Sequence, residues 1–309
     1  MIPYIPGDKL EVPLSFLLHL PFIGDVFDAN HPPSIKPFGT LVALGVYIGS
    51  MLAMRRAKER GLDAKKMNEF IFWSVGLGFV GGHVLDAVFY HPARVARDPL
   101  YLLMLWDGLS SYGGFIGATL GALLWRRSRR ESILAYSEVF CSAFPLAWVF
   151  GRAGCASVHD HPGRLSDAWF AVRYPASGLG LGSDGYIGRY DLGLYECLLS
   201  IPLAIAIWIL WQRRPVRPLG FYIGIVCTAY APVRFCLDFL REHEQNGVSG
   251  GDPRYLGLTP AQWACFGLLA LGIYFLNMAR NPPQVPEEGT PPRKKKRKRR
   301  SPARAGDEP

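Results

Sequence analysis

The sequence has few charged side chains and no cysteine pattern of the kind found in small secreted domains. Charged residues make up 19% of the 309 residues, and the six cysteines follow no pairing pattern. An average soluble protein carries about 25% charged residues, and the missing pattern argues against a disulfide framework. No cleavable signal peptide is expected, because the apolar stretch 14–23 is short and lacks both a basic start and a small-residue cleavage site.

Apolar residues, by contrast, are abundant and gathered into long windows. Hydrophobic residues make up 50% of the chain. A helix needs about 20 mainly apolar residues to cross a bilayer. Seven windows reach or approach that length, and they span residues 38–54, 70–90, 112–125, 133–149, 192–211, 219–240 and 262–278. We therefore predict an all-α integral membrane protein with seven transmembrane helices.

Basic residues predict how these helices are oriented. They follow the first, third and fifth windows, and a further basic run, 293–300, follows the seventh. Loops rich in Lys and Arg lie on the cytoplasmic side of membrane proteins. The N-terminus is therefore expected outside and the C-terminus in the cytoplasm, which places a polar loop of residues 150–191 on the outer side.

Three regions follow from this prediction. Residues 1–37 would form an arm lying against the outer membrane surface, and residues 38–280 the transmembrane domain. Residues 281–309 would form a basic cytoplasmic tail, solvated beside anionic lipid headgroups. We do not expect the tail to bind nucleic acid.

One stretch combines an arginine, small residues and titratable side chains just after the fourth window. Its residues of interest are Arg152, Gly154, Cys155, His159, Asp160, His161 and Gly163. An arginine at the rim of a membrane helix indicates a functional site. Cys155 is the one cysteine expected in a polar loop. For His159 and His161, two solvated loop histidines are the alternative to a catalytic role.

Polar residues inside or beside the other windows are further candidates. They are His83, Asp86, Tyr112, Gly113, Gly114, Arg189, Glu196, Arg234, Asp238, Arg241 and Glu242. His83 and Asp86 share a helix face and are either a mutually satisfied pair or the lining of a functional cavity. Arg234 and Asp238 are either a structural ion pair, or Arg234 joins Arg152 in gripping one phosphate. Arg189 is expected at the rim, touching lipid phosphates.

Taken in order, several of these blocks resemble the prolipoprotein diacylglyceryl transferase family. The resemblance covers residues from about 38 to 278. It rests on Trp106 through Gly117, on Gly151-Arg152-Ala153-Gly154 continuing to Gly163-Arg164, on Tyr195-Glu196, and on Arg234 through Glu242. It implies an enzyme of the bacterial inner membrane whose site faces the periplasm. That enzyme would transfer the diacylglyceryl group of phosphatidylglycerol to the lipobox cysteine of lipoprotein precursors and release glycerol phosphate.

The resemblance also implies roles for residues. Arg152 and Arg234 would bind the phosphate and stabilise the leaving group. The other residues considered catalytic are Tyr112, His159, Asp160 and His161. Contacts to phosphatidylglycerol, neighbouring lipid or the precursor are expected from His83, Gly113, Gly114, Gly154, Cys155, Gly163, Glu196, Asp238, Arg241 and Glu242. No cofactor and no metal is expected.

The chain departs from the family pattern at several of these positions. Tyr112 stands where the family has a histidine, Cys155 where it has an asparagine, Asp160 where it has a glutamate and His83 where it has an arginine. The acceptor cysteine reacts as a thiolate. A tyrosine with a pKa of about 10 is a poor base at neutral pH. His159 or His161 could supply the base instead, because a free imidazole has a pKa of about 6.5.

Two other functions fit the same residues. The fold could carry a different lipid-headgroup or acyl-transfer activity, or none, because a fold alone does not fix chemistry. The chain could also be a membrane metal-binding or transport protein, with His83, Asp86, His159, Asp160 and His161 as ligands. The His-Asp-His triplet does not by itself bring two imidazoles to one ion.

Overall fold

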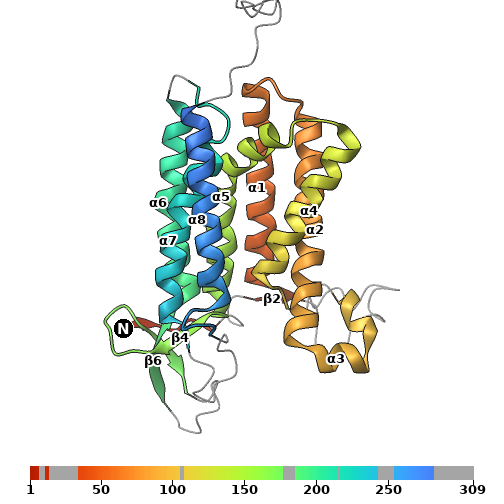
Figure 1. The fold of residues 1–309 in the computed structure, drawn as a ribbon. Coiled ribbons are helices and arrows are strands. Elements are labelled where there is room, and N and C mark those ends of the chain that lie inside the picture. Colours follow the sequence, from red (N-terminus) through yellow and green to blue (C-terminus); the bar gives the residue numbers. More distant parts are fainter. Residues whose placement is uncertain are drawn as a thin grey trace, which may run out of the picture.

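In the computed structural model, long helices lie side by side in a bundle (Figure 1). The structure describes residues 1–6, 11–13, 34–104, 108–176, 185–213, 216–242 and 254–281. The side chains of Tyr90, Ser111 and Tyr112 are outside this description. The long helices are α1 (Pro37–Glu59), α2 (Ala64–Tyr90), α4 (Ser111–Arg129), α5 (Ile133–Val158), α6 (Leu192–Gln212), α7 (Phe221–Leu237) and α8 (Pro260–Arg280). Helix α3 (Pro92–Arg97) and two 3-10 segments, η4 (Pro99–Leu103) and η6 (Asp238–Leu240), are short. Each predicted apolar window contains one long helix.

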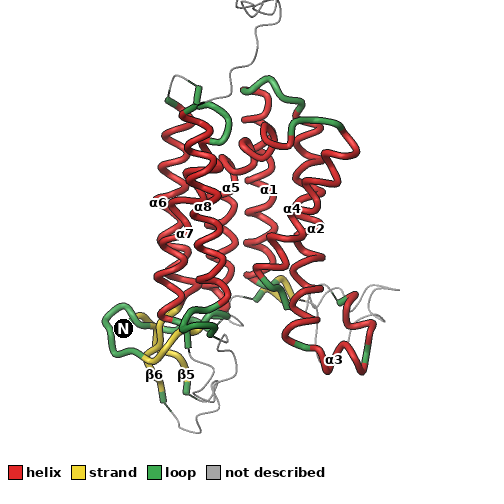
Figure 2. Tube along the Cα trace, in the orientation of Figure 1, coloured by secondary structure: helices red, strands yellow, loops and turns green. Residues whose placement is uncertain are grey.

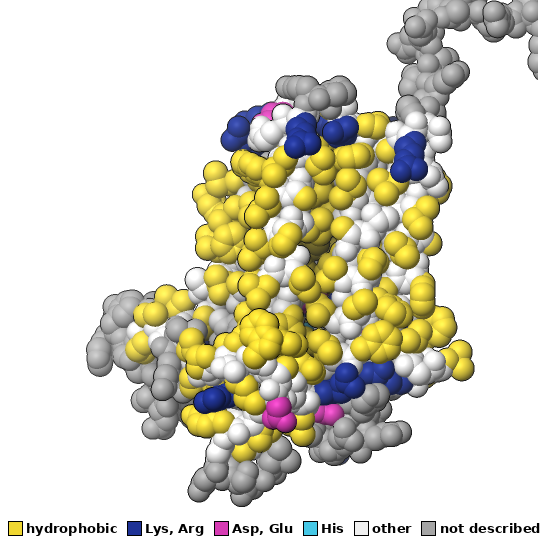
Figure 3. Space-filling model, turned by 90° about the vertical axis from the view of Figure 1, so that its left-hand side faces the viewer, with side chains coloured by type: hydrophobic (Ala, Val, Ile, Leu, Met, Phe, Trp, Pro, Cys, Tyr) yellow, Lys and Arg dark blue, Asp and Glu magenta, His cyan; other side chains and the backbone are white. Residues whose placement is uncertain are grey.

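The outer surface of the bundle is apolar along its length. Six of the described helices, α1, α2, α5, α6, α7 and α8, are long and apolar enough to cross a membrane. A helix of 21 residues is about 31 Å long, which matches a bilayer core of about 30 Å. Large apolar side chains lie exposed on these helices, among them Tyr47, Phe72, Ile205 and Tyr274, and hydrophobic atoms cover the middle of the face in Figure 3. The chain is a multi-pass integral membrane protein.

Helix α4 corresponds to the third predicted crossing and packs tightly along α2. Three of its glycines, Gly113, Gly117 and Gly121, each face an α2 backbone carbonyl so closely that a Cβ atom would collide with it. Small residues at such an interface allow membrane helices to approach closely. Among the described residues, α4 is not one of the six helices apolar enough to cross a membrane. The count of seven crossings and the sides of the two termini therefore stay predictions.

A small β-sheet at one end of the bundle was not predicted from the sequence (Figure 2). Its strands are β1 (Ile2–Pro3), β4 (Pro162–Leu165), β5 (Val172–Pro175) and β6 (Tyr186–Asp191), in the order β1-β5-β6-β4. β1 pairs parallel with β5, and the other pairs are antiparallel. A separate antiparallel pair joins β2 (Val12–Pro13) and β3 (Ser34–Ile35). Part of the predicted arm thus completes a sheet whose other strands come from the predicted loop.

The prediction that residues 150–191 form a loop was wrong at its start. Helix α5 continues to Val158, so Arg152, Gly154 and Cys155 lie on a helix and not in a polar loop. Neighbouring helices cover this last part of α5: Gly154 faces Phe38 of α1, and Cys155 faces Gly193 of α6. The helix ends at His159, whose φ of 50° is left-handed, a common way for a helix to stop.

Candidate functional site

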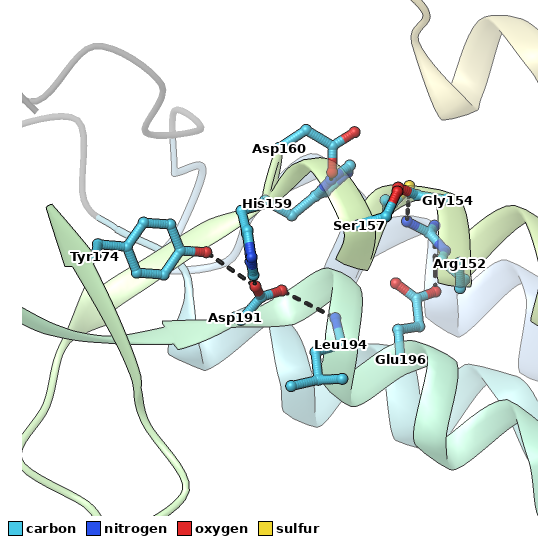
Figure 4. A network of polar contacts seen from close by, with 11 residues as sticks. Arg152, Gly154, Ser157, His159, Asp160, Tyr174, Asp191, Leu194 and Glu196 are labelled. Carbon is cyan, nitrogen blue, oxygen red and sulfur yellow. Dashed lines mark hydrogen bonds and ion pairs between the residues drawn. The ribbon is translucent and has the colours of Figure 1, made fainter. Parts of the chain in front are cut away.

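The polar residues predicted to act together gather where α5, α6, α7 and α8 meet the β-sheet. Helices α5 and α7 end there, and α6 and α8 begin there. Figure 4 shows part of this region, with Arg152 and Glu196 on neighbouring helices and His159 turned towards Asp191.

Arg152 is buried inside the bundle and has partners on three sides. Its Nη2 lies 3.3 Å from Oε1 of Glu196 on α6. Its Nη1 donates to Sγ of Cys155 at 3.8 Å. The guanidinium carbon lies 4.5 Å from the ring centre of Trp148, a cation–π contact. These contacts fix the guanidinium group in place without saturating its hydrogen-bond donors.

Glu196 forms an ion pair with Arg152 and acts electrostatically on Arg234, the two arginines predicted to bind phosphate. The side chain is buried, and Tyr230 of α7 donates its hydroxyl hydrogen to Oε1. Glu196 also attracts Arg234 electrostatically, and the positive charges of Arg152 and Arg234 repel each other. Glu196 therefore has two partners on neighbouring helices, Arg152 and Tyr230, and its negative charge also reaches Arg234.

Asp238 forms a second anionic centre one helical turn beyond Arg234. It is fully buried, and its Oδ1 lies 2.8 Å from Nη1 of Arg234 and 3.2 Å from Nε of Arg241. Thr259 donates its hydroxyl hydrogen to Oδ2 of Asp238. Thr259 also begins α8 with a capping box. The arginine and aspartate pair predicted from their spacing is therefore present and is anchored by α8.

Arg189 was predicted to touch lipid phosphates at the rim, and this was wrong. Its side chain is only 1% exposed. The guanidinium group pairs with Glu242 and donates from Nε to the carbonyl of Gly163 at 2.7 Å. Gly163 in turn forms an isolated antiparallel bridge with Arg241. Arg189 therefore joins strand β4 to the segment after α7, because strand β6 carries it into the interior.

His159 faces the β-sheet, away from Arg152 (Figure 4). Its Nδ1 lies 2.5 Å from Oδ2 of Asp191, and its ring stacks on Tyr4 with the centroids 4.3 Å apart. Asp191 also accepts from the Tyr174 hydroxyl at 3.0 Å and caps α6 by accepting from the backbone of Leu194. Burial and the Asp191 charge hold the pKa of Tyr174 well above its usual value. This network joins the end of α5 to the start of α6.

Asp160 and His161 lie on the other side, near Cys155. The ligand-type atoms of Cys155, Asp160 and His161 lie within 4.8 Å of one another. Nδ1 of His161 lies 2.5 Å from Oδ1 of Asp160. Because Cys155 contacts Arg152, the structure groups His161 with the arginines and separates it from its near neighbour His159.

Four other predicted site residues lie on α2 and α4, and three of them, His83, Gly113 and Gly114, lie near backbone atoms of neighbouring segments. His83 is buried, and its ring nitrogens lie 3.3 Å from the carbonyl of Gly108 and 3.0 Å from that of Tyr101. It is thus not paired with Asp86, which faces His91 instead. Gly113 lets α4 approach α2, whereas a Cβ atom added at Gly114 would lie 3.9 Å from the Gly78 carbonyl oxygen, an ordinary contact distance. Tyr112 lies on the first turn of α4, and its side chain is outside the described part.

Several residues of this region were not singled out from the sequence. They are Trp148, Tyr174, Asp191, Tyr230 and Thr259. Tyr230 precedes Arg234 by four residues, a spacing that places both on one helix face. Asp191 and Thr259 each stand directly before a helix, where such residues act as caps. Those signals locate the side chains but do not reveal that they bind Glu196, His159 or Asp238.

Several known proteins are similar in sequence to this chain over most of its length. The family model for prolipoprotein diacylglyceryl transferase matches residues 26–278. The phosphatidylglycerol–prolipoprotein diacylglyceryl transferase of Chromohalobacter salexigens is 31% identical over 256 residues, which cover 82% of this chain and 89% of that protein. The enzymes of the same name from Idiomarina loihiensis and Sinorhizobium medicae are 27% and 26% identical, covering 81% and 79% of this chain and 90% and 89% of theirs. The chain belongs to the prolipoprotein diacylglyceryl transferase family.

Proposed function

We propose that this protein transfers the diacylglyceryl group of phosphatidylglycerol to the lipobox cysteine of lipoprotein precursors. It acts as a multi-pass protein of the bacterial inner membrane, with the site open to the periplasm. Support comes from the family, from the names of the relatives, and from the predicted positive-inside orientation. The observation that carries the proposal is that buried Arg152 and partly buried Arg234 both interact with the charge of one buried carboxylate, Glu196.

Arg152 and Arg234 bind the phosphate of phosphatidylglycerol in this proposal. Guanidinium groups present planar donor pairs that match phosphate oxygens. Before the lipid binds, Glu196 offsets part of their positive charge. Asp238 holds Arg234 and Arg241 in position, and Arg189 holds Glu242 and the Gly163 carbonyl. Gly154 supports Arg152 by letting α5 approach α1.

The reaction forms one bond to sulfur and breaks one bond to oxygen. The acceptor thiolate attacks the glyceryl carbon that carries the phosphate. As the carbon–sulfur bond forms, the carbon–oxygen bond breaks, and its electron pair stays on the phosphate oxygen. Glycerol phosphate leaves with one additional negative charge, and the thiol proton passes to solvent. The arginines lower the barrier because they stabilise the charge that develops on the leaving group.

The acceptor thiol approaches Arg152 from the side of Cys155, Asp160 and His161. We assign the catalytic role to His161 and not to His159, because His159 is stacked on Tyr4 and paired with Asp191, while His161 lies near Cys155. Tyr112, Gly113 and Gly114 begin α4 at the same predicted outer level, and His83 supports the neighbouring segment through Tyr101 and Gly108. These residues border the path of the substrates.

Replacement of the two arginines in cells tests this function. The chain is expressed in bacteria depleted of their own transferase, and a lipoprotein precursor is followed by mass. Wild type is expected to add the diacylglyceryl mass, while Arg152→Lys and Arg234→Lys reduce the modified fraction at least about a hundredfold, as expected for loss of a transition-state donor. Arg173→Lys, at an exposed position of β5, serves as the control.

Two results would contradict the proposal. A folded wild-type protein that leaves the precursor unmodified would favour another headgroup-transfer activity or none. Full activity of both lysine variants would remove the arginines from the mechanism. The orientation is tested separately by a fluorescent protein fused after Arg280, which is expected to fold and fluoresce in the cytoplasm.

A further inference from the structure

Cys155, Asp160 and His161 converge because of the way α5 ends. Cys155 lies on the last turns of the helix, and the left-handed residue His159 turns the chain so that the next two residues fold back over the helix end. The sulfur, a carboxylate oxygen and an imidazole nitrogen then lie within 4.8 Å of one another. Within the described part of the chain, no other three His, Cys, Asp or Glu side chains come together in this way.

We propose that these three residues form a zinc site whose fourth position takes the thiol of the acceptor cysteine. The proposal rests on the transferase function proposed above and supplies the activation of its nucleophile. The metal site considered from the sequence also included His83, Asp86 and His159, whereas this site joins Cys155 to Asp160 and His161.

The donor set favours zinc over other common ions. One thiolate, one imidazole and one carboxylate are the ligand types of zinc, and three protein ligands with an open position characterise its catalytic sites. Calcium and magnesium require mostly oxygen ligands. Zinc bond lengths place tetrahedral ligand atoms about 3.4–3.6 Å apart. The three ligand atoms lie within 4.8 Å of one another, so binding would draw them closer, and the side chains of Asp160 and His161 are partly exposed.

The charges around the cluster also suit a zinc ion. The Cys155 thiolate and the Asp160 carboxylate neutralise a divalent cation. An acceptor thiolate in the fourth position would leave the centre with one negative charge, and Arg152 lies beside it, with Nη1 3.8 Å from Sγ of Cys155. Cys155 is buried, and a buried thiol ordinarily keeps its proton. A metal that replaces that proton explains how such a side chain can bind as a thiolate.

Zinc would solve the chemical problem created by Tyr112. A free cysteine has a pKa of about 8.5, so only a small fraction is thiolate at neutral pH. A thiol that coordinates zinc is deprotonated outright. Its proton passes to water, and the zinc-held sulfur then attacks the glyceryl carbon. The carbon–oxygen bond breaks with its electron pair on the phosphate oxygen held by Arg152 and Arg234. The thioether product, a weaker ligand, leaves zinc, whose oxidation state does not change.

Metal content of the full chain, purified in detergent and dialysed against zinc, is the first test. Elemental analysis is expected to find about one zinc per chain, and Cys155→Ser, Asp160→Ala and His161→Ala are each expected to weaken zinc binding at least about tenfold. Cys227→Ser, at another buried cysteine, and His91→Ala, at an exposed histidine, are matched controls. Melting temperatures verify that each variant is folded. Less than about a tenth of an equivalent in wild type, or unchanged affinity in the three variants, overturns the proposal.

Cobalt then tests whether the acceptor thiol binds the metal. In cobalt-loaded protein, the thiolate-to-cobalt absorption is expected to roughly double when a lipobox peptide adds a second sulfur ligand. The same peptide with serine in place of cysteine should leave it unchanged. An unchanged spectrum with the cysteine peptide would overturn the role in thiol activation.

Transferase assays on the same preparations separate the two proposals. Removal of zinc is expected to abolish transfer, and its return to restore it. If a zinc-free preparation of wild type transfers the diacylglyceryl group and His161→Ala does not, the zinc site is overturned. The transferase function then stands, with His161 as a base. Zinc and peptide binding without any transfer would support the zinc–thiol site and overturn the transferase function.

Discussion

Glu196 is predicted to act as a counter-ion that the lipid phosphate must overcome, and Glu196→Gln tests this directly. The substitution keeps the size of the side chain and removes one negative charge from beside Arg152, at 3.3 Å, and from near Arg234. Two consequences follow, and they have opposite signs. The folded protein should lose stability, while the site should bind anions more tightly.

The magnitudes can be worked from the contacts. Loss of one partner of a buried ion pair costs about 3–5 kcal/mol. The amide oxygen of glutamine can still accept from Tyr230 or Arg152, so we expect the lower end of that range. A carboxylate about 6 Å from a bound phosphate repels it by about 3 kcal/mol at an effective dielectric constant of about 20. Its removal should strengthen binding of glycerol phosphate by about 30- to 150-fold.

The assay is thermal unfolding of the purified protein with and without glycerol phosphate. Without ligand, Glu196→Gln should melt at a lower temperature than wild type, and glycerol phosphate should protect the variant at lower concentrations than it protects wild type. Glu138→Gln is the matched control. Glu138 is also buried, but it caps the start of α7 by accepting from the backbone of Tyr222 at 2.8 Å and Ile223 at 3.2 Å. It should lower stability without changing anion affinity. Weaker binding of glycerol phosphate by Glu196→Gln would refute the reasoning.

Substitutions at three further positions, Thr259, Gly163 and Tyr174, have expected outcomes that follow from the contacts or the burial of these residues. Thr259→Val removes both the cap of α8 and the hydrogen bond to Asp238, so it should lower stability by about 1 kcal/mol and reduce turnover. Thr259→Ser keeps the hydroxyl group, so its melting temperature and its transfer activity should match those of wild type. Gly163→Ala places a Cβ 2.6 Å from a backbone carbonyl and should lower the melting temperature, whereas Gly151→Ala, with nothing within 4 Å, should not. Because the pKa of Tyr174 is raised, its contribution to stability is complete below about pH 10 and is lost as pH rises further, when the unfolded chain ionises first. Tyr174→Phe should therefore lose less stability than wild type between pH 9 and pH 11 in denaturant titrations.

The long helices could be predicted because each depends on its own sequence. An apolar window of about 20 residues carries its own reason to be a helix in lipid, and each predicted window holds one. The end of α5 could not be predicted in the same way. Its residues from Phe150 to Val158 include two glycines, Arg152 and Ser157, which interrupt the apolar window, and the contacts of this segment with α1 and α6 are not visible in the sequence. The sheet was missed for a related reason, since β1 and β5 pair across more than 160 residues of chain.

The candidate site was predicted more accurately in its composition than in its contacts. Spacing alone placed Arg234 and Asp238 on one helix face, and the structure pairs them. Spacing could not show that His159 and His161, two residues apart, point to different partners. That division depends on one left-handed backbone conformation at His159, which no periodic pattern records. Arg189 was misplaced because burial of an arginine depends on a partner far along the chain, here Glu242.

The balance of charge in the site suggests why a carboxylate stands among the phosphate-binding arginines. Three guanidinium groups, from Arg152, Arg234 and Arg241, surround the carboxylates of Glu196 and Asp238, which leaves one net positive charge. Phosphatidylglycerol carries one negative charge on its phosphodiester, so the bound lipid neutralises this group of five side chains, the cluster of Cys155, Asp160 and His161 being counted separately. The departing glycerol phosphate carries nearly two, because its second pKa is about 6. Neutrality thus favours the substrate, and the surplus negative charge of the product favours its release. Without Glu196 the net positive charge of these side chains would equal the negative charge of glycerol phosphate. Slow release of glycerol phosphate would then limit turnover.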